Sequence, residues 1–154
     1  YFFFTDKEGF YRLAKLMFTG MTIFLIISTL VPNGLNIRPY SFERDNVFVD
    51  MVKLLYRADT PTNVMPSIHV YNSLAACIAV SRSRKLQSNK PVCAATYILA
   101  VLIILATMFL KQHSVIDVAA AIVMAYMLYQ FFYAPEVRRY SQRRPARAAM
   151  LQNK

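Results

Sequence analysis

The sequence predicts an all-α integral membrane protein, a helical bundle with an interfacial helix in its first outer loop. Of the 154 residues, 56% are hydrophobic. Several uncharged runs approach the length of about 20 residues that a membrane-spanning helix needs. The basic residues fall mainly on one side when these runs are threaded through a bilayer. At this length the chain forms a single membrane domain, residues 1–154.

The first predicted span is the uncharged run Leu16–Val31, which residues 13–15 extend and Pro32-Asn33-Gly34 ends. Ahead of it lie an aromatic run, residues 1–4, and a polar stretch, residues 5–9. This order is typical of the end of an earlier membrane helix and its exit turn. We therefore expect the chain to be a fragment that lacks its N-terminal helices.

The next segment predicts the interfacial helix. Ser41 can cap a helix of about four turns that reaches Arg57. Its apolar face consists of Val47, Phe48, Met51, Val52, Leu54 and Leu55, and its polar face of Glu43, Asp45, Asp50, Lys53 and Arg57. A helix this amphipathic lies in the headgroup region of a bilayer and does not cross it.

Three more spans complete the predicted bundle. Pro66 fits the first position of a helix over Pro66–Val80, a run of 15 residues that is short for a lone span. The apolar runs Val92–Leu110 and Ser114–Tyr133 follow as the last two spans. After them the tail Glu136–Lys154 is basic.

Charge gives the predicted orientation. If the loop Arg82–Lys90 is cytoplasmic, thirteen of the 18 basic residues and three of the 8 acidic residues lie inside, and five of each lie outside. The inner side then carries the whole formal charge of +10, as the positive-inside rule requires. We therefore expect a multi-pass protein of the cell membrane, with residues 136–154 as a basic cytoplasmic tail. The charge needs no nucleic-acid partner to explain it.

The same threading brings three separated segments to the outer face. They are Arg38-Pro39, Pro66-Ser67-Ile68-His69 and Lys111–Asp117, and they contain both histidines of the chain. His113 and Asp117 are four residues apart, on one helix face, so the carboxylate can accept an imidazole N–H and raise the basicity of the other nitrogen. A purely structural pair that ties two helices together is an open alternative.

Together the three segments predict an anion site. Two helix N-termini, at Pro66 and near Ser114, would direct unpaired N–H groups at one place. Arg38 and Lys111 can supply positive charge to phosphate oxygens. Two histidines beside an anion, one of them backed by a carboxylate, suit nucleophilic attack combined with delivery of a proton.

These segments resemble, in order, the motifs K-x6-R-P, P-S-G-H and S-R-x5-H-x3-D of the type 2 phosphatidic acid phosphatase superfamily. Arg38-Pro39 resembles the end of the first motif, residues 66–69 the second, and His113 with Asp117 the third. The resemblance implies six membrane helices, about four of them present here. It also implies metal-independent phosphoryl transfer through a phosphohistidine, with no cofactor. The implied partners are the lipid bilayer and a phospholipid or isoprenoid phosphate substrate.

Carried over residue by residue, the resemblance implies that His113 is the nucleophile, Asp117 its orienting partner and His69 the proton donor to the leaving oxygen. Residues expected to hold the phosphate are Arg38, Ser67 and Lys111, and residues expected near the substrate are Tyr40 and Asn63.

Each of the three motifs has at least one position that differs in this chain. The first-motif Lys falls at Val31, the second-motif Gly at Ile68, and the third-motif Ser-Arg at Ala106-Thr107. The pattern in which the Arg is lost and His-x-x-x-Asp is kept resembles the sphingomyelin synthase and inositol phosphorylceramide synthase branch, whose members transfer a phospho-headgroup to another lipid. Three functions therefore stay open: a lipid phosphatase at the outer leaflet, a headgroup transferase, and a non-catalytic lipid-binding relative.

Overall fold

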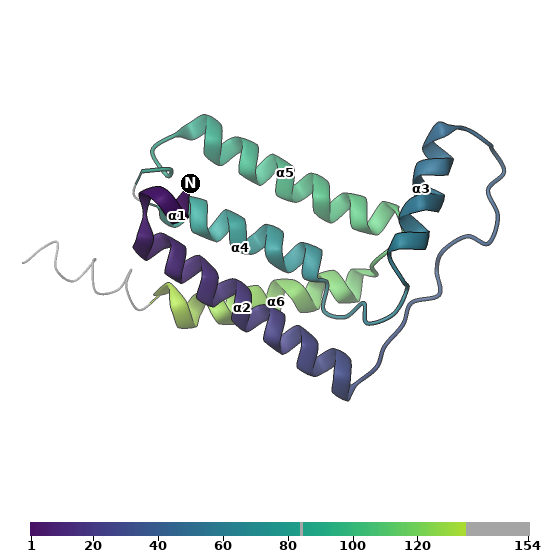
Figure 1. The fold of residues 1–154 in the computed structure, drawn as a ribbon, viewed down its shortest axis with the longest axis horizontal. Coiled ribbons are helices and arrows are strands. Elements are labelled where there is room, and N and C mark those ends of the chain that lie inside the picture. Colours follow the sequence, from purple (N-terminus) through teal and green to yellow (C-terminus); the bar gives the residue numbers. More distant parts are fainter. Residues whose placement is uncertain (84, 135–154) are drawn as a thin grey trace, which may run out of the picture.

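The computed structural model describes residues 1–83 and 85–134, and within them all regular structure is helical (Figure 1). The helices are α1 (Phe2–Thr5), α2 (Lys7–Leu30), α3 (Val47–Ala58), α4 (Ile68–Arg82), α5 (Lys90–Phe109) and α6 (Val115–Phe132). Helices α2, α4, α5 and α6 lie lengthwise beside one another, and α3 lies across one end of the bundle. The predicted tail, residues 136–154, falls outside the described residues.

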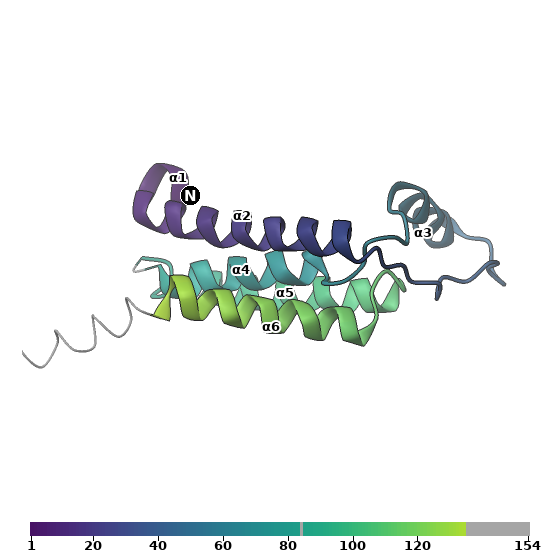
Figure 2. The ribbon, with the colours of Figure 1, turned by 90° about the horizontal axis from the view of Figure 1, so that it is seen from below.

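In the described part of the chain, three helices are long and apolar enough to cross a membrane, namely α2, α5 and α6. The fourth predicted span, α4, has 15 residues and is therefore about 22 Å long, against about 30 Å for a hydrocarbon core. It lies in the middle of the bundle and contacts each of the three longer helices (Figure 2). The chain is a multi-pass helical membrane protein with this short helix at its centre.

The core between α2, α4 and α6 is built around Tyr71. Its side chain is fully buried, and its hydroxyl donates a hydrogen bond of 2.6 Å to the carbonyl of Leu16. The ring lies so close to Gly20 of α2 that a Cβ atom at that residue would overlap it. Ala75 of α4 and Ala121 of α6 are also fully buried. Small residues at these contacts allow the helix backbones to approach closely.

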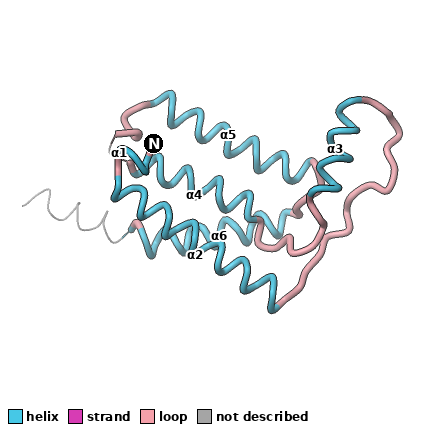
Figure 3. The backbone as a smooth tube through the Cα atoms, viewed as in Figure 1, coloured by secondary structure: helices cyan, strands magenta, loops and turns pink. Residues whose placement is uncertain are grey.

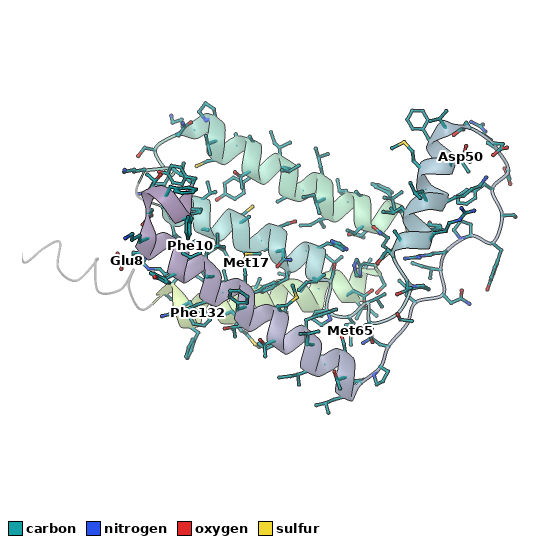
Figure 4. The ribbon with its side chains drawn as sticks, viewed as in Figure 1. Glu8, Phe10, Met17, Asp50, Met65 and Phe132 are labelled. Carbon is teal, nitrogen blue, oxygen red and sulfur yellow. The ribbon has the colours of Figure 1, made fainter. Side chains whose placement is uncertain are left out.

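The outward faces of the long helices are strongly apolar. On α5, which has α4 as its main neighbour, the exposed apolar side chains are Tyr97, Ile98, Leu99, Val101, Leu102, Leu105 and Phe109. A contiguous apolar surface of this kind belongs against lipid or another membrane helix. Figure 4 shows such side chains projecting away from the bundle along α5.

Helices α2 and α3 begin furthest from their predicted first residues, because polar caps and not apolar runs set their starts. Helix α2 begins at Lys7, where the Asp6 carboxylate accepts a hydrogen bond of 2.9 Å from the Gly9 N–H, so the predicted exit turn shrinks to one residue. Helix α3 begins at Val47, well after Ser41. Its cap is Asn46, whose side chain accepts from the Val49 N–H at 3.0 Å.

The remaining starts follow the same rule. Pro66 is not the first residue of α4, because Ser67 is the cap and its hydroxyl accepts from the Val70 N–H at 3.4 Å. Asn89 caps α5. Ser114 caps α6, which confirms that a helix restarts at that residue.

The loop after α2, residues 31–46, is hydrogen-bonded to the loop after α3, residues 59–67. Both lie at the end of the bundle where α3 lies, here called the α3 end. Figure 3 shows these two loops as the longest non-helical segments. Asn33, which follows α2, accepts from the Met65 N–H through its side chain at 2.9 Å. Its own carbonyl accepts from the Asn63 N–H at 2.6 Å. The loop after α2 therefore fixes the segment that leads into α4.

Candidate active site

The two histidines lie side by side at the α3 end. His69 is in the first turn of α4, and His113 immediately precedes the cap of α6. Their ring centroids are 5.7 Å apart and the ring planes are inclined by 61°. His113 is 8% exposed, whereas His69 is exposed. A buried and an exposed imidazole are thus close enough to contact one tetrahedral group.

Asp117 is engaged mainly with the start of its own helix. Its Oδ2 accepts from the Ser114 backbone N–H at 2.7 Å and from the Ser114 hydroxyl at 2.8 Å, which completes a capping box. The same oxygen lies 4.0 Å from His113 Nδ1, beyond hydrogen-bonding distance. The expected imidazole–carboxylate hydrogen bond is therefore not made, because the cap uses the acceptor. Within the described residues, His113 Nδ1 is buried without a hydrogen-bond partner.

The surroundings of His113 favour its neutral form. Burial, and secondly the neighbouring His69, lower the pKa of His113 below its ordinary value of 6.5. The Asp117 carboxylate, a hydrogen bond to the Val64 backbone and the Asp59 carboxylate act in the opposite direction without cancelling the effect. The ring nitrogen consequently keeps its lone pair to lower pH than a free histidine would.

Ser67 connects the starts of α4 and α6. Its side chain is fully buried, and its backbone N–H donates to the Asp117 carbonyl at 3.2 Å. The two helix N-termini therefore meet beside the histidine pair. Each N-terminus contributes the partial positive charge of its helix dipole.

Arg38 reaches the α3 end through contacts with the C-terminal part of α3. Its Nη2 donates to Asp59 Oδ2 at 3.0 Å, and its Nη1 donates to the Asp59 carbonyl at 2.5 Å and to the Tyr56 carbonyl at 3.3 Å. The guanidinium carbon lies 4.6 Å from the centre of the Tyr56 ring. Nε is buried and has no hydrogen-bond partner in the described part of the chain.

Asp59, Tyr56 and Gln112 are residues of this region that the sequence did not single out. Gln112 Nε2 donates to the same Asp59 oxygen as Arg38, at 2.9 Å. The Tyr56 hydroxyl donates to the Leu110 carbonyl at 2.8 Å. Both contacts join α3 to residues 110–114, the turn that carries His113. These pairings link residues 53 and 54 positions apart, so no local pattern signals them.

Three expected site residues lie apart from these contacts. Lys111 is exposed, with a φ of 52°, and its backbone N–H donates to the Met108 carbonyl at 3.0 Å. Tyr40 is 93% exposed and its hydroxyl pairs with the Asn36 side chain. Asn63 is exposed and contacts Asn33 through its backbone. The structure therefore brings together His69, His113, Asp117 and Ser67, with Arg38 joined to them through Asp59 and Gln112.

The two positions that lack the motif cations have different surroundings. Val31 is 58% exposed at the end of α2. Thr107 is buried in α5, and its hydroxyl donates to the Ile104 carbonyl at 2.8 Å. The Thr107 carbonyl also accepts from the backbone N–H groups of Gln112 and His113, at 2.9 and 3.2 Å. Thr107 thus shapes the turn that carries His113 and offers no charge to an anion.

Across residues 1–83 and 85–134, no group of three or more His, Cys, Asp or Glu side chains is arranged to hold a metal ion. The α3 end holds two imidazoles, a guanidinium and two helix N-termini, together with the Asp59 and Asp117 carboxylates, which are hydrogen-bonded to Arg38 and Gln112 and to Ser114. The imidazoles, the guanidinium and the helix N-termini complement an anion.

Comparison with known proteins identifies one family. The family model described as the PAP2 superfamily matches residues 14–140, which is most of the chain and includes every residue of the candidate site. No curated protein and no solved structure matches the chain.

Proposed function

The chain belongs to the PAP2 superfamily, and from that premise we propose that it is a membrane-embedded lipid phosphatase that acts through a phosphohistidine on His113 and needs no metal. Members of this superfamily are generally phosphatases or phosphotransferases. Because the chain has membrane-spanning helices, we propose that the phosphate ester is on a lipid. The observation that carries it is the pair of imidazole rings, one buried and one exposed, 5.7 Å apart between two helix N-termini.

In the proposed first step, a neutral ring nitrogen of His113 attacks phosphorus, a nitrogen–phosphorus bond forms, and the bond between phosphorus and the ester oxygen breaks. His69 gives its proton to that oxygen, so the lipid alcohol leaves neutral. In the second step His69 takes a proton from water, whose oxygen attacks phosphorus. The nitrogen–phosphorus bond breaks, and phosphate leaves.

Burial supports this division of roles between the histidines. The lowered pKa of His113 keeps the nucleophile unprotonated near neutral pH. The exposed ring of His69 is free to exchange protons with solvent. We further propose that Arg38 and the N-termini of α4 and α6 stabilise the phosphoryl oxygens, whose charge is spread in the transition state.

We also propose that the α3 end faces the extracytoplasmic side, so that the lipid substrate comes from the outer leaflet. The opposite end carries Lys7, Arg12, Arg82 and Lys85, which fits a cytoplasmic face. A lipid phosphate in the outer leaflet would then meet the histidines at the depth of its headgroup.

A headgroup transferase is the second candidate function. Residues 31 and 107 hold no basic side chain, and the structure places a buried threonine at the second of these. In this alternative the hydroxyl of a second lipid takes the place of water in the second step. The two activities differ only in the acceptor, so the same assay separates them.

The test is to incubate the purified full chain with a panel of lipid phosphates in the presence of a chelator, with water, diacylglycerol or ceramide as acceptor. We expect release of inorganic phosphate. His113→Ala and His69→Ala should each lower turnover by about 100-fold or more. Thermal unfolding of both variants checks that they fold. A wild-type protein inactive toward every lipid and acceptor, or an active His113→Ala variant, would contradict the proposal.

The covalent intermediate gives an independent test. The chain contains two histidines, so an acid-labile phosphoryl group has only two histidine positions to occupy. Rapid quenching with radiolabelled substrate should trap the labelled phosphoryl group on the wild-type protein and should trap none on His113→Ala. A label that persists in His113→Ala would assign the nucleophile elsewhere.

A further inference from the structure

One carboxylate oxygen joins three separate parts of the chain at the α3 end. Asp59 Oδ2 accepts from Arg38 Nη2 at 3.0 Å and from Gln112 Nε2 at 2.9 Å. Arg38 lies in the loop after α2, Asp59 follows α3, and Gln112 precedes His113. The Asp59 side chain is 42% exposed, whereas that of Arg38 is 12% exposed and Gln112 is 8% exposed.

Asp59 binds the Nη1 and Nη2 atoms of the Arg38 guanidinium and makes no hydrogen bond to Nε. The Asp59 carboxylate and carbonyl take Nη2 and Nη1, and the Tyr56 carbonyl also accepts from Nη1. Two of these three acceptors are backbone carbonyls at the end of α3, which an incoming anion does not displace. Nε stays buried without a partner among the described residues. A guanidinium carries five N–H donors and these contacts use three, so the donor on Nε is one of two left for an oxygen ligand.

The same carboxylate also bears on the histidine turn. Gln112 is bound by Asp59 through its side chain, and its backbone N–H and that of His113 both donate to the Thr107 carbonyl. The Tyr56 hydroxyl fixes the preceding Leu110 carbonyl. The backbone bonds to Thr107 and the Tyr56 contact do not involve Asp59, so they hold the turn that presents His113 when Asp59 is removed. The main effect of losing Asp59 is therefore expected on the guanidinium of Arg38.

We infer that Asp59 is a positioning residue, which sets the guanidinium of Arg38 at a fixed place relative to His113 so that both act on one phosphate group. This inference rests on the proposed function, since it assigns Arg38 to the phosphate. It predicts that Asp59 acts through Arg38, so that in a protein without Arg38 the loss of Asp59 has little effect on kcat/KM or on phosphate binding.

A double-mutant cycle tests that dependence. The four proteins are wild type, Asp59→Ala, Arg38→Ala and the double variant, assayed on a short-chain phosphatidic acid. Asp59→Ala should lower kcat/KM by about 100-fold, the loss expected when a contributing group is displaced by about 1 Å. Arg38→Ala should lose at least as much. The double variant should match Arg38→Ala within about twofold.

Losses that multiply in the double variant would overturn the inference, because Asp59 would then act independently of Arg38. An Asp59→Ala protein as active as the wild type, or more active, would also overturn it, since Asp59 would then compete with the substrate for the guanidinium. The matched control is Asp45→Asn. Asp45 is an acid on the same side of the bundle whose side chain is 88% exposed and pairs with Lys53. It should leave kcat/KM unchanged.

A binding measurement separates this inference from the proposed activity. Inorganic phosphate should raise the unfolding temperature of the wild type and of Asp45→Asn, and should have no effect on Arg38→Ala or Asp59→Ala. Asp59→Asn keeps an oxygen acceptor and loses the charge, so its response should be intermediate, and it serves as the variant of choice if Asp59→Ala does not fold.

Absence of a phosphate effect in the wild type, or a full effect in Asp59→Asn, would contradict the role of Asp59. A phosphate effect that depends on Asp59 and Arg38 in a protein with no turnover would support the positioning role and contradict the proposed function. The two ideas can therefore fail separately.

Discussion

His113 is a buried imidazole between groups that move its pKa in opposite directions. Burial and His69 lower it, and Asp117 and Asp59 raise it. Because Asp117 lies at 4.0 Å and is bonded to Ser114, it acts on His113 by charge across space and not by a shared proton. A carboxylate at this place can therefore set the pH range of activity without setting the tautomer of the ring.

The pH profile of kcat/KM should depend on the negative charge of the Asp117 carboxylate beside His113. If unprotonated His113 attacks phosphorus, the acidic limb follows the pKa of His113 in the free enzyme. Asp117→Asn keeps acceptors for the α6 cap and removes the negative charge, so the pKa of His113 falls further and the acidic limb moves to lower pH. Asp50→Asn, whose carboxylate faces Lys53 on α3, should leave the limb in place. A limb that moves to higher pH in Asp117→Asn would contradict the assignment.

Gly20 shows how one residue fixes the packing of two helices. A Cβ atom there would overlap ring atoms of Tyr71, which is fully buried and hydrogen-bonded to Leu16. Since neither the ring nor the α2 backbone has room to move freely, Gly20→Ala should destabilise the fold by about 1–3 kcal/mol. Thermal unfolding in detergent measures this, with Thr22→Ala at an exposed position of α2 as the control. Equal unfolding temperatures for the two variants would show that the contact yields without cost.

Residues that carry a motif could be predicted from the sequence, and residues that support them could not. His69, His113 and Asp117 stand at motif spacings, and the structure places them together. Asp59 and Gln112 act through pairings that exist only once α3 is folded against the turn at residues 110–114. The role of Asp117 in the helix cap could not be predicted either, because a carboxylate at this spacing can accept a hydrogen bond from Ser114 or from His113.

At the scale of the secondary-structure element, α3 differs from the other helices. It presents the apolar side chains Val47, Phe48, Met51 and Leu54 to the surroundings, with exposures of 63–78%. Its other face holds Asp50 and Lys53, which pair with each other. In Figure 2 it lies off the end of the bundle, away from the packed core. The exposure of this apolar face fits insertion into the headgroup region.

A tryptophan placed on α3 tests its depth in the bilayer. The chain contains no tryptophan, so Phe48→Trp introduces a single reporter on the apolar face and Asp50→Trp one on the polar face. If α3 lies in the interface, Phe48→Trp should emit at shorter wavelength than Asp50→Trp and be quenched more strongly by brominated lipids. Equal quenching of the two would show that α3 does not rest on the membrane with its apolar face.

Helix ends show the limit of apolar patterns at this scale. The apolar run alone starts the first span near residue 13, whereas α2 begins at Lys7 because Asp6 caps it. The amphipathic pattern starts the interfacial helix near Ser41, but Asn46 supplies the cap of α3. The start of α6 was predictable since its cap and its apolar run begin together at Ser114.

For the whole molecule, the fold class follows from composition, and the number of crossings depends on α4. The three longer helices meet the length and hydropathy expected of spans, and α4 is short but surrounded by them. A helix of 15 residues inside a bundle need not match the bilayer, because its neighbours and not lipid surround much of it. With the proposed function, we expect the polar ends of α4 to lie below the membrane surface and the histidine pair to lie at the depth of a lipid headgroup.

Accessibility of two engineered cysteines settles both the crossing and the orientation. The two cysteines are introduced in a Cys77→Ser, Cys93→Ser background. Tyr40→Cys is at the α3 end and Lys85→Cys at the opposite end, and both positions are exposed. The helices between them are α3 and α4. An impermeant maleimide added to intact cells should label Tyr40→Cys, and should label Lys85→Cys only after permeabilisation. Labelling of both from outside would mean that α4 does not cross the bilayer. The reverse pattern would keep α4 as a span and place the histidines on the cytoplasmic side, where the substrate would be an inner-leaflet lipid.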